Sequence, residues 1–233
     1  MIIPPIGLGT WPMKGHECSG AVAKAIEIGY RHIDTAQFYE NEKDVGAGIR
    51  LSGIPRGELF LVTKICRESF DQDPLKSVER SLADLGTSYV DILFIHDFFD
   101  VPVQDMMGVL KESKDRGYAK YLGVSNFEPH EMEEAQKCLE IEVRQDMFYP
   151  FMPRPPGDIP FIAYSPLKFA VSNSRIGDLA ASYGKTPAQI ALRWIVQQGM
   201  AAIPKASKAD HLKENISIFD FSLSDSDMSN SSP

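Results

Sequence analysis

Short apolar runs alternate with helical segments about eight times along the 233 residues, and this alternation is the feature that most constrains the fold. Parallel strands joined by right-handed helical crossovers close most naturally into a barrel. We therefore predict an α/β fold, a compact (β/α)8 TIM barrel that forms one domain over residues 1–233. The runs expected to form its strands are Ile6–Gly9, Tyr30–Asp34, Leu59–Lys64, Val90–His96, Lys120–Ser125, Ile141–Gln145, Phe161–Tyr164 and Ala201–Pro204.

Helical spacing and capping residues place the connecting helices. Asp73 before Pro74 is a typical helix start, and Gly86 and Gly117 are typical helix ends. The expected helices cover Cys18–Gly29, Lys43–Leu51, Asp73 to Gly86, Val103–Arg116, Glu128–Leu139, Ile176–Tyr183, Thr186–Gln198 and Lys208–Ile216.

One crossover departs from this pattern. Pro150, Pro153, Pro155, Pro156 and Pro160 lie between the sixth and seventh expected strands and forbid a regular helix there. We expect a shortened sixth crossover in which a loop replaces the helix. The polar end of the chain, residues 224–233, is expected to fray.

The composition excludes several other classes of protein. Lys and Arg total 24 against 32 for Asp and Glu, so the net charge of -8 leaves no basic surplus for nucleic acid. Cys18, Cys66 and Cys138 form neither a disulfide framework nor a zinc motif, and reduced thiols fit a cytoplasmic protein. No apolar run approaches the ~20 residues of a membrane span. We expect no membrane partner and no metal, because His16 and Cys18 are two isolated potential ligands.

Polar residues close three successive expected strands, and the active sites of such barrels gather at the carboxyl ends of the strands. Asp34, Lys64 and His96 occupy these ends, and Tyr39 follows the first of them. Lys64 and Asp34 beside Tyr39 are expected to stabilise a phenolate, lower the Tyr39 pKa and make its hydroxyl a proton donor. Each residue alone is more often structural, whereas their joint occurrence predicts a catalytic site.

Seven segments carry a resemblance to the aldo-keto reductases. They are Gly7-Leu-Gly-Thr-Trp11, Gly29-Tyr-Arg-His-Ile-Asp-Thr-Ala-Gln-Phe-Tyr39, Leu61-Val-Thr-Lys64, Asp91-Ile-Leu-Phe-Ile-His96, Gly123-Val-Ser-Asn-Phe127, Ala163-Tyr-Ser-Pro-Leu167 and Ile203-Pro-Lys205. The resemblance implies a catalytic set of Asp34, Tyr39, Lys64 and His96. It also implies reduction of aldehydes or ketones to alcohols, with NADPH or NADH as hydride donor and Tyr39 as general acid.

The resemblance also implies a set of cofactor-binding residues. Amide and hydroxyl side chains would hold the nicotinamide carboxamide, Tyr164 would stack on the ring, and the last helix would meet the adenosine end. The full set is Gly9, Thr10, Asp34, Ser125, Asn126, Gln145, Tyr164, Ser165, Pro166, Leu167, Lys205, Ser207, His211, Glu214 and Asn215. His211 stands where the family usually has an arginine on the 2′-phosphate of NADP. Imidazole does not replace that bidentate cation, so we expect a weaker NADPH preference and real use of NADH.

The expected substrate is a small carbonyl compound, bound by a chain that the resemblance suggests is a monomer. The expected pocket residues are Trp11, Tyr39, His96, Phe98 and Phe99. Compared with the family, the N-terminal hairpin is reduced and the covering C-terminal loop is missing, which favours an open, permissive pocket. Two alternatives are a weakly catalytic or non-catalytic, cofactor-binding regulatory barrel, and a hydrolase or isomerase using Asp34 and His96.

Overall fold

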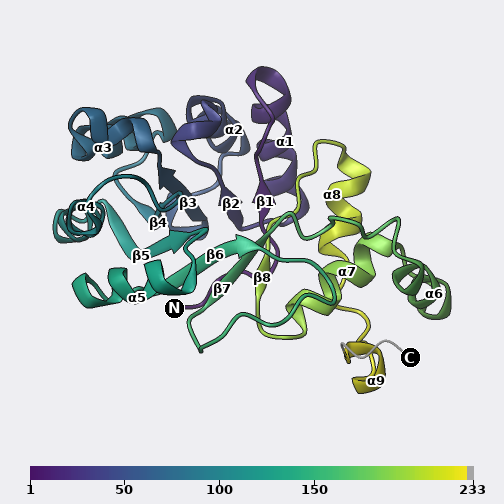
Figure 1. The fold of residues 1–233 in the computed structure, drawn as a ribbon. Coiled ribbons are helices and arrows are strands. Elements are labelled where there is room, and N and C mark those ends of the chain that lie inside the picture. Colours follow the sequence, from purple (N-terminus) through teal and green to yellow (C-terminus); the bar gives the residue numbers. More distant parts are fainter. Residues whose placement is uncertain (230–233) are drawn as a thin grey trace.

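Eight parallel strands pair in chain order and curl into a barrel (Figure 1), as seen in a computed structural model that describes residues 1–229. The strands are β1 (Leu8–Gly9), β2 (His32–Asp34), β3 (Phe60–Ile65), β4 (Val90–Ile95), β5 (Ala119–Ser125), β6 (Val143–Met147), β7 (Phe161–Tyr164) and β8 (Ala201–Ala202). Parallel bridges from Ile6 to Ala202 and from Gly9 to Lys205 join the first and last strands. The predicted (β/α)8 barrel is therefore confirmed.

Helices follow most strands and surround the barrel (Figure 1). They are α1 (Gly15–Ile28), α2 (Glu42–Ser52), α3 (Pro74–Leu85), α4 (Val103–Asp115), α5 (Pro129–Cys138), α6 (Ser174–Tyr183), α7 (Pro187–Val196), α8 (Ala209–Ile216) and α9 (Asp225–Met228). The predicted cap at Asp73 is confirmed, because its side chain accepts from the backbone N–H groups of Leu75 and Lys76. Gly86 ends α3 in the left-handed conformation, with φ of 72°. Short 3₁₀ turns, unforeseen in the sequence, include η1 (Gln37–Tyr39) and η3 (Arg67–Asp71).

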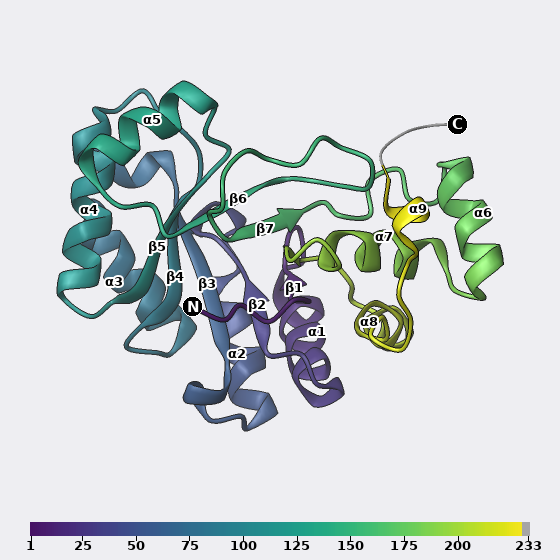
Figure 2. The ribbon, with the colours of Figure 1, turned by 90° about the horizontal axis from the view of Figure 1, so that it is seen from below.

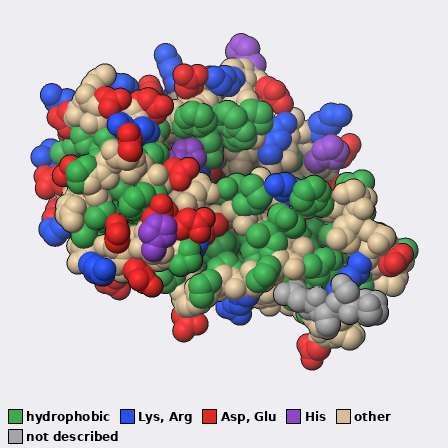
Figure 3. Space-filling model, in the orientation of Figure 1, with side chains coloured by type: hydrophobic (Ala, Val, Ile, Leu, Met, Phe, Trp, Pro, Cys, Tyr) green, Lys and Arg blue, Asp and Glu red, His purple; other side chains and the backbone are tan. Residues whose placement is uncertain are grey.

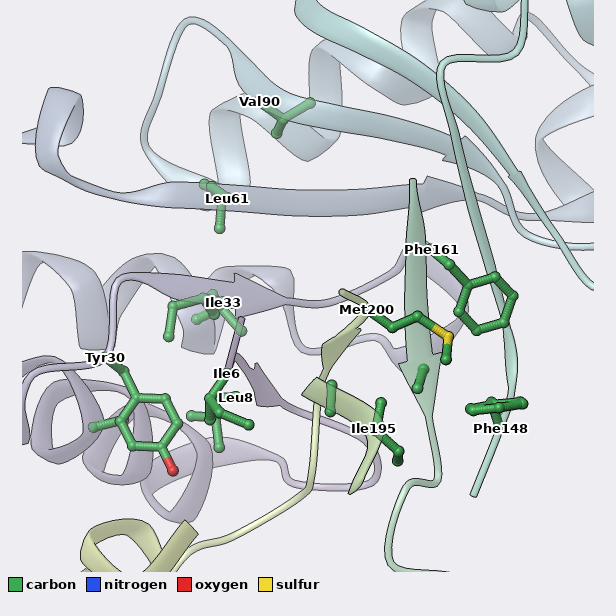
Figure 4. Packing of buried hydrophobic residues seen from close by; sticks show 14 of the residues in the cluster. Ile6, Leu8, Tyr30, Ile33, Leu61, Val90, Phe148, Phe161, Ile195 and Met200 are labelled. Atoms are coloured by element: carbon green, nitrogen blue, oxygen red, sulfur yellow. The ribbon is translucent and has the colours of Figure 1, made fainter. Parts of the chain in front are cut away.

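Alternate residues of each strand face opposite sides of the barrel wall. Leu61 and Ile33 belong to the large cluster between strands and helices (Figure 4), whereas Val62 and Phe94 belong to a smaller cluster with Ile162. The smaller cluster fills the barrel interior with side chains. The same alternation decides which polar residues at the strand ends face the barrel axis.

The sixth crossover has no helix. Residues 148–160 run from β6 to β7 as coil, and Figure 2 shows this segment passing between α5 and the pair α6 and α7. The cavity beside it, of about 810 Å³, is lined by residues that include Met132 of α5, Val196 of α7 and Phe161. A loop thus replaces the sixth helix, as the sequence predicts, and its residues Pro155, Pro156 and Pro160 line the cavity.

The chain end differs from the expectation of fraying from residue 224. Asp225–Met228 form α9, because Ser224 caps its first turn and the Tyr183 hydroxyl donates to the Asp227 carboxylate over 2.6 Å. The rest of the expected tail, residues 230–233, lies outside the described residues. On the face shown in Figure 3, acidic and basic side chains are interspersed around a broad apolar region.

The contact between α1 and α2 is close enough to require glycine at position 48. A Cβ atom there would lie 2.6 Å from the Ser19 carbonyl oxygen and 2.7 Å from Val22 Cβ. We predict that Gly48→Ala lowers the free energy of unfolding by about 2 kcal/mol, through overpacking. Gly20→Ala is the matched control, because a Cβ atom there meets nothing within 4 Å. It should leave stability unchanged or raise it by up to about 1 kcal/mol. Equal effects in urea unfolding would refute this packing argument.

Candidate active site

Inward-facing polar residues converge where the strands end. Asp34 ends β2, Ser125 ends β5 and Tyr164 ends β7, while Lys64 lies one residue before the end of β3. They line or adjoin a cavity of about 400 Å³, here called the main cavity, whose lining is Gly9, Thr10, Trp11, Asp34, Phe38, Tyr39, His96, Ser125, Asn126, Gln145, Tyr164, Ser165, Ile203 and Lys205. Most of the residues expected at a site are thus brought together by the barrel.

A fully buried ion pair lies at the base of the main cavity. The Lys64 ammonium donates to Asp34 Oδ1 over 2.5 Å, to the Thr35 carbonyl over 2.9 Å and to the Tyr39 hydroxyl over 3.3 Å. All three ammonium protons therefore have acceptors. The second Asp34 oxygen accepts from the Gln145 amide over 2.8 Å. Although burial lowers the pKa of Lys64, the adjacent Asp34 and Tyr39 raise it overall, so this lysine stays charged.

The Tyr39 hydroxyl points at this lysine, but its pKa differs from the sequence expectation. Burial raises the pKa of Tyr39, and the negative charge of Asp34 raises it further. Lys64 lowers this pKa, but by less than burial and Asp34 together raise it. The sequence predicts a lowered Tyr39 pKa, and this prediction is wrong because the net shift is upward. Tyr39 therefore stays protonated near neutral pH, and the adjacent Lys64 ammonium is placed to stabilise a phenolate.

His96 forms part of the opposite wall and is held neutral. Its ring contacts those of Tyr39 and Phe38, with centroids 5.5 and 5.9 Å apart. Burial, reinforced by the Lys64 charge, lowers the pKa of His96 to about 3. The imidazole is therefore uncharged near neutral pH, and it offers one N–H donor and one lone pair rather than a positive charge.

Amide and hydroxyl groups crowd one side of the main cavity. Asn126 Nδ2 donates to the His96 carbonyl over 3.0 Å and to Ser125 Oγ over 3.2 Å, and the Tyr164 hydroxyl donates to Asn126 Oδ1 over 2.7 Å. Asn126 has a φ of 60°, and its N–H donates to the Asp146 carboxylate over 2.8 Å. Asparagine adopts this left-handed conformation more readily than most residues other than glycine.

The residues expected at an adenosine end lie beside β8 and α8. Lys205 Nζ lies 3.4 Å from Ser207 Oγ and 3.5 Å from Glu17 Oε1, and His211 is exposed on α8. Glu214 accepts from Thr186 Oγ1 over 2.5 Å, so part of its carboxylate joins α8 to α7. Of the remaining expected residues, Asn215 and Pro166 are buried, Leu167 is half-buried, and Ser165 is exposed with a φ of 51°.

The aromatic wall of the main cavity differs from the expected set, because Phe38 joins it and Phe98 and Phe99 do not line it. Trp11 stacks on Phe38 at 5.8 Å and contacts Tyr39 at 5.2 Å, so Phe38 joins the wall although sequence reasoning missed it. Phe99 lines a second cavity of about 220 Å³, here called the side cavity, together with Phe38, Cys66, Arg67, Glu68, His96, Asp97 and Asn126. Phe98 lines neither cavity and packs edge-on against Phe127 at 5.1 Å.

Sequence reasoning also missed the residue that anchors the turn carrying Tyr39. The Gln37 amide nitrogen donates to Ser77 over 3.1 Å and to Ser81 over 3.0 Å, and its oxygen accepts from Cys66 N and Ser69 Oγ. Every hydrogen-bonding position of the amide is thus used. These partners lie 29 to 44 residues further along the chain, so no local pattern marks Gln37.

A buried carboxyl group continues this network. Glu42 accepts from Thr63 Oγ1 over 2.5 Å and from Ser81 Oγ over 3.0 Å. Burial raises the pKa of Glu42 to about 7, the nearby Asp84 adds to the rise, and the two hydroxyl donors and Lys64 oppose it. Its neighbour Asn41 donates to the carbonyl groups of Thr10 and Met13.

Residues 1–229 contain no cluster of three or more His, Cys, Asp or Glu side chains able to hold a metal ion. No helix in this part of the chain is both long and apolar enough to cross a bilayer.

Comparisons with known proteins agree with the barrel and its site. The model of the Aldo/keto reductase family matches residues 5–171 and 169–231. A 9,11-endoperoxide prostaglandin H2 reductase from Trypanosoma cruzi is 36% identical over 97% of this chain and 86% of that protein. A glyoxal reductase from Bacillus subtilis is 36% identical over 97% of this chain and 87% of that protein. The chain belongs to the aldo/keto reductase family.

Solved structures give the same result. The crystal structure of a putative 2,5-diketo-D-gluconic acid reductase B superposes with a TM-score of 0.90 at 34% identity, covering 97% of this chain and 85% of that one. An aldo/keto reductase from Brucella melitensis gives a TM-score of 0.89 at 36% identity, covering 97% of this chain and 93% of that one. The predicted resemblance is confirmed, and the family and its named relatives support carbonyl reduction.

Because of Glu42, the free energy of unfolding should decrease as the pH rises. The carboxyl group has an ordinary pKa of 4.5 and a pKa of about 7 in the folded chain, so between these values folding retains a proton that unfolding releases. The stabilisation is complete below pH 4.5 and is lost as the pH rises through 7. The loss is on the order of 3 kcal/mol.

We predict that Glu42→Gln, which keeps the size and the hydrogen-bonding capacity, flattens this decline and raises stability at about pH 8 by 1–3 kcal/mol. Urea unfolding across the pH range measures it, with the exposed Glu58→Gln as control. Parallel pH profiles for the two variants would show that Glu42 does not carry the effect.

Proposed function

We propose that this chain reduces an aldehyde or ketone to an alcohol with NADPH or NADH, using Tyr39 as the general acid. The observation that carries the proposal is the Lys64 ammonium, which bridges Asp34 and the Tyr39 hydroxyl at the base of the main cavity. Burial keeps the tyrosine protonated, and the ammonium stabilises the anion formed when the tyrosine gives up its proton.

The donor chemistry of the main cavity fits a nicotinamide. Ser125, Asn126 and Gln145 offer the hydroxyl and amide groups that pair with a carboxamide, and the half-buried Tyr164 ring suits a planar heterocycle. Lys205 provides a cation at the far side of the same cavity for a phosphate group. When bound, the nicotinamide supplies a hydride to the carbonyl carbon.

The protein's own residues then handle the oxygen and its proton. Tyr39 transfers its hydroxyl proton to the carbonyl oxygen as negative charge develops there. Lys64, already 3.3 Å from the Tyr39 oxygen, stabilises the resulting phenolate. His96 is neutral and donates an N–H to the same carbonyl oxygen, which orients it without adding charge.

Two of the relatives are named for carbonyl substrates, whereas the prostaglandin H2 reductase is named for an endoperoxide. Glyoxal is a small uncharged dicarbonyl, whereas 2,5-diketo-D-gluconic acid carries a carboxylate. We propose small carbonyl compounds as the substrate class, acted on by a monomer in the cytoplasm. Free thiols at Cys18, Cys66 and Cys138 support a reducing compartment.

Replacing the Tyr39 hydroxyl tests the proposal directly. We predict that Tyr39→Phe lowers kcat for glyoxal by at least about 100-fold, because the proton donor is removed. Cofactor binding, followed by quenching of protein fluorescence, should be retained. Tyr118→Phe is the control, since that hydroxyl bonds Glu79 on the surface. Cofactor binding without turnover by the unmodified chain, across several aldehydes and ketones, would instead support the non-catalytic regulatory role.

The cofactor preference is tested at His211. We predict comparable kcat/KM for NADPH and NADH in the unmodified chain, because the exposed imidazole makes no bidentate pair with a 2′-phosphate. His211→Arg should raise the NADPH to NADH ratio about tenfold, through new charge-assisted hydrogen bonds. His130→Arg adds the same charge to α5 and should leave the ratio unchanged. A strong NADPH preference before substitution would contradict the prediction.

A further inference from the structure

The side cavity opens next to the reacting groups. It shares Phe38, His96 and Asn126 with the main cavity and extends from them toward η3. If the carbonyl group meets Tyr39 and His96, the side cavity offers adjoining space for the remainder of a larger substrate. The inference drawn here rests on the proposed function and concerns which substrates that function accepts.

The side cavity contains one cation, and two carboxylates already hold it. Arg67 Nε donates to Asp100 Oδ1 over 2.5 Å, and Arg67 Nη1 donates to Asp71 Oδ1 over 2.7 Å. A guanidinium engaged on two edges is not free to clamp a substrate carboxylate through the same donors. Together with its two partners Arg67 carries a net charge of −1, although neither Asp71 nor Asp100 lines the side cavity.

Two acidic side chains line the same cavity. Glu68 belongs to η3, and Asp97 directly follows His96. The Asp97 carboxylate accepts from the Phe98 N–H over 2.9 Å, and no Lys or Arg is in ion-pair distance of it among residues 1–229. Partial burial raises the pKa of Asp97, and Glu131 adds to the rise, so its surroundings are acidic rather than basic.

The other positive groups near the reacting atoms do not offset the negative charge of Asp97 and Glu68. Lys64 is neutralised by Asp34, and His96 is uncharged. Arg144 forms an ion pair with Asp146. Lys205 lines the main cavity but not the side cavity, and in the proposed function it serves the cofactor.

We propose that this site discriminates against anionic carbonyl substrates and accepts uncharged or cationic ones, with Asp97 as the residue that determines the preference. The apolar rings of Phe38 and Phe99 provide contact area for any such substrate, while Asp97 and Glu68 repel a carboxylate carried on its far end. Between the two kinds of substrate named for the relatives, the structure favours the uncharged one.

Three aromatic aldehydes of matched length test the proposal: 4-nitrobenzaldehyde, 4-carboxybenzaldehyde and 4-(trimethylammonio)benzaldehyde. The nitro and carboxylate groups have nearly the same shape, so charge is the main difference between the first two. Comparing each variant with the unmodified chain on one substrate cancels the intrinsic reactivity of that aldehyde. The quantity measured is kcat/KM with saturating cofactor.

We expect Asp97→Asn to raise kcat/KM for the carboxylate about fivefold, mainly through KM, and to lower it for the trimethylammonium compound by a similar factor. The nitro compound should change by less than about twofold. In the unmodified chain, an ionic strength of about 0.5 M should shrink the discrimination, because salt screens the repulsion. Asp115→Asn is the control, since it removes the same charge from the C-terminal end of α4.

Two outcomes would overturn the proposal, and they are distinguishable. If the nitro compound is reduced and Asp97→Asn changes all three aldehydes by the same factor, the charge preference is wrong while the proposed function stands. If no aldehyde is reduced with either NADPH or NADH, the proposed function fails and the substrate preference fails with it.

Discussion

The buried ion pair between Lys64 and Asp34 is the interaction on which the rest of the site depends. Charged groups without solvent are costly unless their partners are complete, and here three acceptors surround the ammonium and two donors hold the carboxylate. Neighbouring barrel strands meet this requirement because they fix both backbones in register. Removing either partner alone would leave an uncompensated charge in the barrel, which costs roughly 3–5 kcal/mol.

That pair also sets the electrostatic character of the whole site. Lys64 contributes to the low pKa of His96, whereas burial keeps Tyr39 protonated. The site therefore holds a protonated hydroxyl and a neutral imidazole beside a cation that Asp34 neutralises. Glu68 and Asp97 add negative charge to the side cavity, where Arg67 is paired with Asp71 and Asp100, and Lys205 adds a cation to the main cavity.

A second layer of hydrogen bonds holds the catalytic turn, while the barrel tolerates a lost helix. Gln37 ties the Tyr39 turn to α3 and to the residues beginning η3, so Tyr39 is supported from outside the barrel wall. The missing sixth helix lies on the side of β6 and β7, and the strands there keep their parallel pairing. The ladder hydrogen bonds and the filled interior thus position the site even where the outer ring is incomplete.

The sequence by itself determined the order of strands, the absence of the sixth helix and the polar residues at the strand ends. Prolines, helix caps and the two-residue period of a strand are local signals in the sequence. They are sufficient to place Asp34, Lys64 and His96 at the carboxyl ends of strands. Only the tertiary structure decided the direction of the Tyr39 pKa shift, the position of Phe38 in the wall, the turning of Phe98 toward Phe127 and the anchoring by Gln37. These depend on burial and on contacts between distant segments, and local periodicity carries no information about either.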